Sequence, residues 1–178
     1  MITRAKRKLS KAARKTFLLV GKCTVIAAVC CILANYVFGF CYVRGNYMFP
    51  SIRDGDAIIS YRLSPIVLNE VVVYLSSEDG MKRVGRVVAR EGDTVNLSED
   101  GELLVNGAVA AEEIFYQTLP VEGSTVELPY RVPQGEVFIL NDYRSIDDTS
   151  AKDSRSFGSV SKENLQGKAW LLLRRRGF

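Results

Sequence analysis

Among the residue types that perform chemistry in proteins, this chain lacks histidine. The sequence has none among its 178 residues. A Ser-His-Asp or Cys-His catalytic arrangement, and a zinc or haem site ligated by histidine, are therefore excluded for this chain alone. A general base working at neutral pH would have to be a lysine or carboxylate with a perturbed pKa, or a residue supplied by a partner.

The charge of the chain is unevenly divided. Residues 1–22 carry eight Lys or Arg and no acid, whereas the rest of the chain holds sixteen Lys or Arg against all twenty Asp and Glu. The net charge of +4 thus hides a basic N-terminal arm and a body with a net charge of −4. A weakly acidic body argues against nucleic acid as a partner, and the asymmetry favours placement across a boundary.

An apolar segment follows the basic arm and supplies that boundary. Residues 17–43 contain only two strongly polar side chains, Lys22 and Asn35. As a helix the segment would be about 40 Å long, enough for the roughly 30 Å hydrocarbon core of a bilayer. A cleaved signal sequence is the competing interpretation, but its apolar region usually has about 7–15 residues and ends in an Ala-x-Ala-like site. We expect a basic cytoplasmic arm at 1–16, one plasma-membrane anchor at 17–43 and an extracellular body at 44–178, because basic residues precede the anchor.

All four cysteines fall inside this apolar segment. They are Cys23, Cys30, Cys31 and Cys41. We interpret them as small apolar side chains of a lipid-facing helix. Lipid attachment at Cys41 is rejected, because Phe40 stands where a lipoprotein cleavage site needs a small residue. The external body then has no disulfide and depends on a packed core.

The body consists of short, β-branched runs separated by turn signals such as Asp-Gly and Asn-Gly. No window shows a convincing helical apolar period, although residues 108–115 could form a short helix. We expect a mainly β fold, with a single N-terminal transmembrane helix followed by an antiparallel β-barrel or sheet. The expected strands are residues 57–61, 70–75, 83–89, 94–97, 103–105, 137–140 and 169–173.

Four segments of the body carry motifs in a recognisable order. They are residues 45–51 followed by Asp54-Gly55-Asp56, residues 69–74, residues 85–93 with 104–107 behind them, and residues 137–144 continuing to 153–158. In order and spacing they resemble the type I signal peptidases, peptidase family S26, which are membrane-anchored serine proteases that remove signal peptides from exported proteins. The resemblance implies a signal-peptidase-like body and covers nearly the whole chain.

Both residues of the family's catalytic dyad are replaced in this sequence. The resemblance implies a serine nucleophile where the chain has Tyr47, and a buried neutral lysine as its base where the chain has Gly85. Lys82 is the nearest substitute, but it lies an odd number of residues from Gly85, so a strand sends the two side chains to opposite faces. Ser51 occupies the family's threonine position, and we expect it to hydrogen-bond the local turn. The sequence therefore offers no catalytic residue, and we predict a pseudoenzyme.

The remaining motif residues have other expected roles. Asp142, Arg144, Asp153 and Arg155 are expected to form a structural cluster of ion pairs and hydrogen bonds. Aromatic and apolar side chains crowd the stretch after the anchor, and they suit either core packing beside the membrane interface or a face that contacts lipid or an apolar peptide. The peptide-binding groove is expected to be lined by Tyr47, Met48, Phe49 and Pro50.

A fold that keeps its cleft without its dyad indicates binding, since an extended peptide can add to a strand edge without any nucleophile. The chain resembles the catalytically degenerate SipA/LepA-like accessory proteins encoded with surface pili of Gram-positive bacteria. The resemblance implies a chaperone-like role in pilus assembly, with pilin subunits or exported preproteins, and a sortase, as partners. We expect no metal and no cofactor, and the exposed apolar surface leaves a homodimer open.

Two alternatives remain. One is a divergent but active signal peptidase that uses Lys82 or a residue from a partner. The other is a purely structural membrane protein that binds its partners elsewhere.

Overall fold

The chain divides into an N-terminal helical unit, Met1–Val37, and a β body, Phe38–Phe178. The structure is a computed structural model, and it describes residues 2–110, 114, 116–121, 123–144 and 153–175. Each unit is described by itself below.

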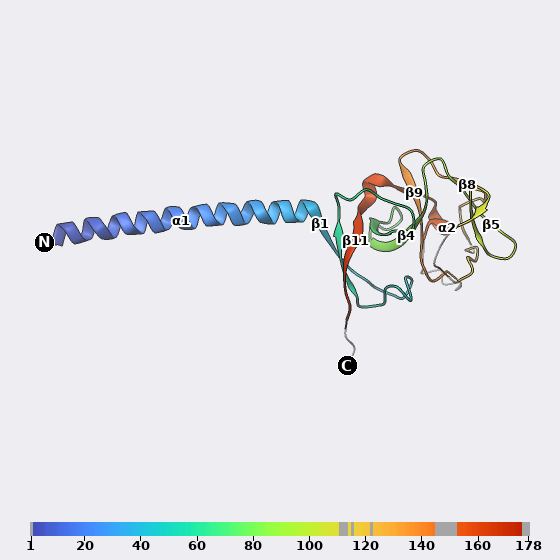
Figure 1. Ribbon diagram of the computed structural model, residues 1–178, viewed down its shortest axis with the longest axis horizontal. Coiled ribbons are helices and arrows are strands. Elements are labelled where there is room, and N and C mark those ends of the chain that lie inside the picture. The colour runs from blue at the N-terminus through green and yellow to red at the C-terminus, as the bar shows by residue number, and fades with distance from the viewer. Residues whose placement is uncertain (1, 111–113, 115, 122, 145–152, 176–178) are drawn as a thin grey trace. The chain divides into compact units, whose positions relative to one another are not determined.

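Helix α1 spans Ile2–Val37 (Figure 1). Its part from Ala13 to Val37 is long and apolar enough to cross a membrane, which fits a single-pass anchor. The polar side chains of Thr24 and Asn35 donate to helix carbonyls four residues earlier, both at 2.9 Å. Backbone carbonyls therefore satisfy these polar groups inside an apolar helix.

The helix ends before the apolar segment does. It ends at Val37, and strand β1, Phe38–Tyr42, pairs along its whole length with β2, Ala57–Tyr61. Cys41 is 3% exposed and lies in the core of the body, so its expected place in a lipid-facing helix is wrong. The apolar run hides this boundary because a buried strand and a membrane helix draw on the same residues.

The body contains two antiparallel sheets (Figure 1). The larger has the strand order β1-β2-β11-β3-β4-β9-β10, and the smaller has the order β7-β6-β5-β8. All seven expected strands are present, while β1, β7, β8 and β10 were not expected. The strands not yet given bounds are β3 Val71–Leu75, β4 Lys82–Arg90, β5 Thr94–Leu97, β6 Leu103–Val105, β7 Ala108–Val109, β8 Tyr130–Arg131, β9 Glu136–Leu140, β10 Val160–Ser161 and β11 Leu165–Leu173.

The helix considered for residues 108–115 is wrong at its start. Ala108–Val109 forms β7, which pairs with β6 across a two-residue turn. The turn residues Asn106 and Gly107 both have positive φ, 55° and 81°. An Asn-Gly turn of this kind folds the chain into a hairpin. Residues 111–113 and 115 lie outside the described residues.

The core of the body is continuous with the strands that carry the motifs. One apolar cluster lies under β1, β2 and the start of β4, and a second joins β9 to the smaller sheet through Phe138 and Leu140. The first cluster consists of Cys41, Val43, Met48, Ile52, Ile58, Val73 and Val84.

Two short helical turns, α2 Ser154–Phe157 and the 3₁₀ turn η1 Lys162–Asn164, precede the last strand.

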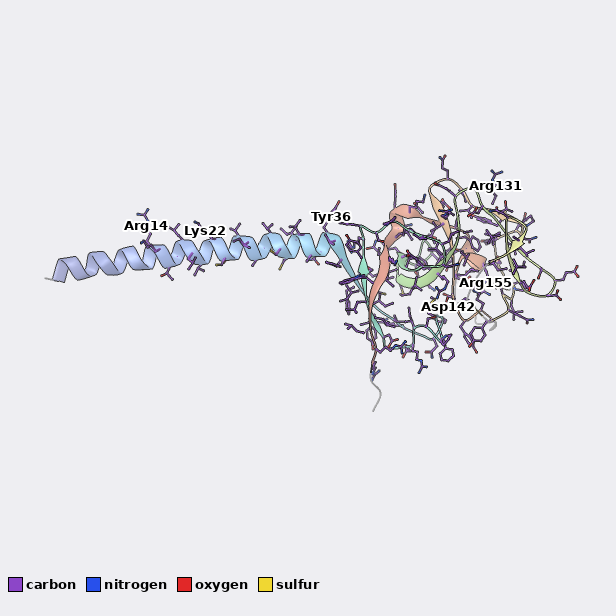
Figure 2. All side chains as sticks on the ribbon, in the orientation of Figure 1. Arg14, Lys22, Tyr36, Arg131, Asp142 and Arg155 are labelled. Atoms are coloured by element: carbon purple, nitrogen blue, oxygen red, sulfur yellow. The ribbon has the colours of Figure 1, made fainter. Side chains whose placement is uncertain are left out.

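Asp153 and Arg155 hold α2 against the end of β9. Asp153 caps α2 by accepting the Arg155 N–H, and it also accepts the Asn141 N–H at 3.1 Å. The Arg155 guanidinium donates to Asp153 and to the carbonyls of Leu119 and Arg144. These groups, including Arg155 in Figure 2, are buried with hydrogen-bonding partners, as such groups must be in a stable fold.

Asp142 forms a separate buried pair, and its partner is Arg86 rather than a residue of the expected cluster. The Arg86 guanidinium binds both carboxylate oxygens of Asp142, a residue labelled in Figure 2, at 2.8 Å. The Asp142 side chain is fully buried. The Ser51 hydroxyl donates to the same carboxylate at 2.7 Å. The expectation that Ser51 bonds its local turn is therefore wrong, because the sheet brings a carboxylate 91 residues away within its reach. Arg144 donates instead to the carbonyl of Asn141 and the hydroxyl of Thr118.

Arg86→Met tests how much the ion pair between Arg86 and Asp142 stabilises the fold. We expect the free energy of unfolding of the full chain in detergent micelles to fall by about 3–5 kcal/mol, because a buried carboxylate loses its countercharge. Chemical unfolding followed by tryptophan fluorescence measures the change.

Lys162→Met is the matched control. It removes an ion pair with Glu91 in which both side chains are nearly half exposed, 46% and 44%, and such pairs contribute little. An Arg86→Met variant as stable as this control would contradict the structural role of the buried pair.

Candidate functional site

A groove of about 480 Å³ opens between β1 with the residues after it and the start of β4. Three other strands lie between these two in the order of the sheet, so the sheet must curl to bring them to one groove. The described residues that line the groove are Cys41, Tyr42, Val43, Arg44, Gly45, Tyr47, Met48, Met81, Lys82, Arg83, Val84 and Asn141.

Both walls of the groove are strand edges. The Val43 N–H donates to the carbonyl of Asp56, so alternation along β1 turns the backbone groups of Phe40 and Tyr42 away from β2. On the other wall the Ser76 N–H donates to the Met81 carbonyl. By the same alternation the backbone groups of Lys82 and Val84 turn away from β3. The groove is therefore bounded by backbone donors and acceptors on both sides.

The floor of the groove is apolar. Cys41, Val43, Met48 and Val84 are each at most 9% exposed and belong to one core cluster. Burial raises the pKa of the Cys41 thiol, and the nearby Lys82 charge only partly opposes this shift. A protonated thiol is a poor nucleophile. The floor thus supplies surface for contact rather than reactive groups.

Tyr47, at the position of the family's nucleophile, lines the groove with its ring folded back over Gly45. A Cβ on Gly45 would lie 2.5 Å from Cε2 of that ring, and Gly45 also has a φ of 86°. The Tyr47 carbonyl accepts the N–H of Tyr143 at 2.9 Å. The backbone at the nucleophile position is therefore fixed, and the side chain that it presents is a phenol.

Gly85, at the position of the family's lysine, has no room for a side chain. A Cβ there would lie 2.5 Å from Cγ2 of Ile139 and 3.2 Å from the carbonyl oxygen of Leu140. The ring of Tyr74 lies next in line, at 3.4 Å. Gly85 does not have a positive φ, so close packing and not backbone conformation requires the glycine.

Tyr74 is the buried polar side chain behind Gly85. Its residue is fully buried, and its hydroxyl has no hydrogen-bond partner among the described residues. Burial raises the pKa of the Tyr74 phenol, so it stays protonated. A neutral aromatic ring thus lies beside position 85.

Lys82 lines the groove, whereas Gly85 is buried against Ile139. The Lys82 Nζ donates to the Phe40 carbonyl on the opposite wall at 3.0 Å. The neighbouring Arg83 pairs with Asp79 at 2.7 Å, and this guanidinium, with the N–H of Met81, lowers the pKa of Asp79 to about 2.

The expected groove residues are only partly brought together. Tyr47 and Met48 line the groove, but Phe49 and Pro50 are not among the described residues that do. The Phe49 ring instead contacts the edge of Tyr143 and lies under the Arg53 guanidinium. Residues 47–52 form a turn, which points consecutive side chains in different directions, so Tyr47 and Met48 line the groove while Phe49 and Pro50 do not.

The second wall and most of the floor were missed. Lys82 was considered only as a base, and Cys41 and Val43 were assigned to the anchor. The sequence carried no local signal for Cys41 and Val43, because residues 40–43 are all apolar and only the structure shows that exposed Phe40 and Tyr42 alternate with buried Cys41 and Val43. The aromatic crowd after the anchor therefore divides into an outer face of β1 and the groove.

The outer face of β1 continues onto neighbouring strands. The Phe38 ring lies 5.7 Å from that of Tyr61 and 5.6 Å from that of Trp170, measured between centroids. Trp170 is 64% exposed, and Phe40 and Tyr42 are also more than half exposed. This face begins at the residue directly after α1.

Comparison with known proteins places this arrangement in a family. Residues 16–173 match the family model described as Signal peptidase, peptidase S26. Signal peptidase I T of Bacillus subtilis (strain 168) is 26% identical over 173 residues, which cover 90% of this chain and 86% of that protein. Signal peptidase I of Bacillus caldolyticus is 30% identical over 174 residues, which cover 89% of this chain and 88% of that protein.

A solved structure is also similar. The crystal structure of a signal peptidase I from Enterococcus faecalis V583 has a TM-score of 0.48 and 21% identity, covering 60% of this chain and 98% of that chain. The family match over residues 16–173 confirms the resemblance drawn from the four motif segments. The chain belongs to the signal peptidase family, peptidase S26.

Proposed function

We propose that this chain is a catalytically inactive member of the family that binds extended segments of exported proteins in its groove. The observation that carries the proposal is the closed lysine position. Gly85 supplies no amine, and Ile139 and Tyr74 occupy the space beside it. Together with Tyr47 in place of the serine, this leaves the groove without a nucleophile and base pair.

The groove supports binding by strand addition. Its walls present backbone groups of β1 and β4, and its floor is apolar. An extended peptide placed between such walls gains main-chain hydrogen bonds on each side and buries alternate side chains. Neither gain depends on a catalytic residue.

The biological setting follows from the anchor and the resemblance. The basic residues before the anchor favour a cytoplasmic N-terminus and a body outside the plasma membrane. The resemblance to pilus-associated members suggests a Gram-positive cell surface and a chaperone-like role in pilus assembly. Pilin subunits or exported preproteins would then occupy the groove, with a sortase acting nearby.

A divergent active peptidase is the second candidate, favoured by relatives named signal peptidase I. Lys82 is the lysine that lines the groove among the described residues. Its ammonium is bonded to the Phe40 carbonyl, and its side chain leaves β4 on a different face from position 85. Lys82 is therefore poorly placed to replace the missing base.

Gly85→Ala tests whether the lysine position is closed. We expect the free energy of unfolding to fall by about 1–3 kcal/mol, because the added Cβ overlaps Ile139. Ile139→Ala alone should lower it by about 2–5 kcal/mol. The double variant should lose less than the sum of the two, since removing Cγ2 of Ile139 makes room for the new methyl group.

Val137→Ala provides the control for this cycle. Val137 is as buried as Ile139 but pairs with Arg90, five residues further along β4. Its effect should add to that of Gly85→Ala. Equal additivity for Ile139→Ala and Val137→Ala would show that the space beside Gly85 is open.

Tyr47→Asp tests the groove as a binding site. The probe is a fluorescein-labelled peptide that spans the signal sequence and first mature residues of a secreted preprotein. We expect the full chain in detergent micelles to bind it, and Tyr47→Asp to weaken binding about tenfold, because aromatic contact surface is lost and a charge is added. Fluorescence anisotropy measures both affinities.

Leu63→Asp is the matched control, since Leu63 is 57% exposed and does not line the groove. It should bind the peptide as the unmodified chain does. If Tyr47→Asp and Leu63→Asp are indistinguishable from the unmodified chain, the groove is not the binding site and a purely structural role is favoured.

A further inference from the structure

The rim of the groove carries an unbalanced charge. Three cations, Arg44, Lys82 and Arg83, line it, and no carboxylate does so among the described lining residues. Asp79, which does not line the groove, pairs with Arg83, so Arg44 and Lys82 carry the excess positive charge of the rim. Asp54 accepts the N–H of Gly45. The body as a whole is acidic, so the groove is positive against the trend of its surroundings.

The Lys82 side chain also reaches across the groove from β4 to β1. Its Nζ donates to the Phe40 carbonyl, an acceptor on β1 that turns away from β2. A peptide strand added to β1 needs that carbonyl for its own N–H. An incoming peptide must therefore displace the Lys82 ammonium, which then needs a new acceptor.

A neutral peptide offers that ammonium only another carbonyl or water. A carboxylate offers a charge-assisted hydrogen bond, which is about twice as strong as a neutral one. The apolar floor formed by Cys41, Val43, Met48 and Val84 meanwhile suits apolar side chains on the face of the peptide that points inward. The groove thus combines an apolar floor with the Lys82 ammonium, which reaches across it.

We propose that the groove selects an extended peptide segment that carries an acidic side chain, and that Lys82 is its specificity-determining residue. The Lys82 ammonium moves from the Phe40 carbonyl onto the carboxylate of the peptide, which opens the β1 edge as the peptide enters. This inference rests on the proposed peptide-binding function and names the chemical class of the peptide.

The test compares three short labelled peptides that alternate valine and serine and differ only in a central Glu, Gln or Lys. Anisotropy with the full chain in phosphatidylcholine nanodiscs should show the Glu peptide binding about fivefold tighter than the Gln peptide, and the Lys peptide weakest. The Glu preference should shrink as salt is raised, because the rim is exposed.

Lys82→Met should remove the preference by two effects. The Glu peptide loses its ion pair, and the Gln peptide gains, because the Phe40 carbonyl no longer has a competing donor. Lys82→Arg should retain the preference. Lys162→Met, an exposed lysine that does not line the groove, should leave all three affinities unchanged.

Equal binding of the Glu and Gln peptides, with both weakened by Tyr47→Asp, would overturn this inference and leave peptide binding in the groove standing. Failure of all three peptides to bind, or binding insensitive to Tyr47→Asp, would overturn both. If phosphatidylglycerol in the nanodiscs abolishes the Glu preference while phosphatidylcholine preserves it, the cations serve an anionic lipid surface and the inference falls.

Discussion

The Asp142 carboxylate is the point at which three segments that frame the groove meet. Arg86 reaches it from β4, Ser51 reaches it from the turn after Tyr47, and Asp142 itself follows β9. A fully buried carboxylate needs this countercharge and these donors, so the three segments cannot shift independently. The bond from the Tyr143 N–H to the Tyr47 carbonyl adds a second link between the same turn and the same strand end. These contacts therefore hold together the segments that frame the groove.

If, as we propose, the chain has lost the catalytic dyad of its family, that frame explains how it keeps the fold. Replacing a serine by Tyr47 changes a side chain at the groove surface, where the ring rests on Gly45. Replacing a lysine by Gly85 lets the β9 side chain Ile139 and the ring of Tyr74 pack close to the backbone of β4. Close packing of this kind stabilises the body. It also means that a serine at position 47 and a lysine at position 85 would not by themselves restore the geometry of a catalytic site. The strand edges and apolar floor of the groove are the features on which the proposed peptide binding depends.

The sequence predicted what depends on local order and failed where distant segments meet. Turn residues such as Asn106 and Gly107 mark the end of an expected strand, and the order of the motifs identified the family. β1 was missed because its apolar residues continue the run of α1, and nothing local separates lipid contact from core burial. The hydrogen bonds of Ser51 and Arg86 to Asp142, and that of Lys82 to the Phe40 carbonyl, join segments far apart in the sequence. Only the curled sheet brings these segments together. Phe49 and Pro50 were placed in the groove by proximity in sequence, although the turn directs them elsewhere.

The central claim is that the groove binds a peptide without cutting it, and cleavage is its most direct measurement. The full chain in detergent micelles is incubated with a secreted preprotein, and intact mass spectrometry follows the preprotein over time beside an active signal peptidase I. We predict that the active enzyme processes the preprotein while this chain leaves it intact, because Gly85 and Tyr47 provide neither base nor serine. Specific cleavage by this chain after a small-x-small site, lost in Tyr47→Phe or Lys82→Met, would contradict the account.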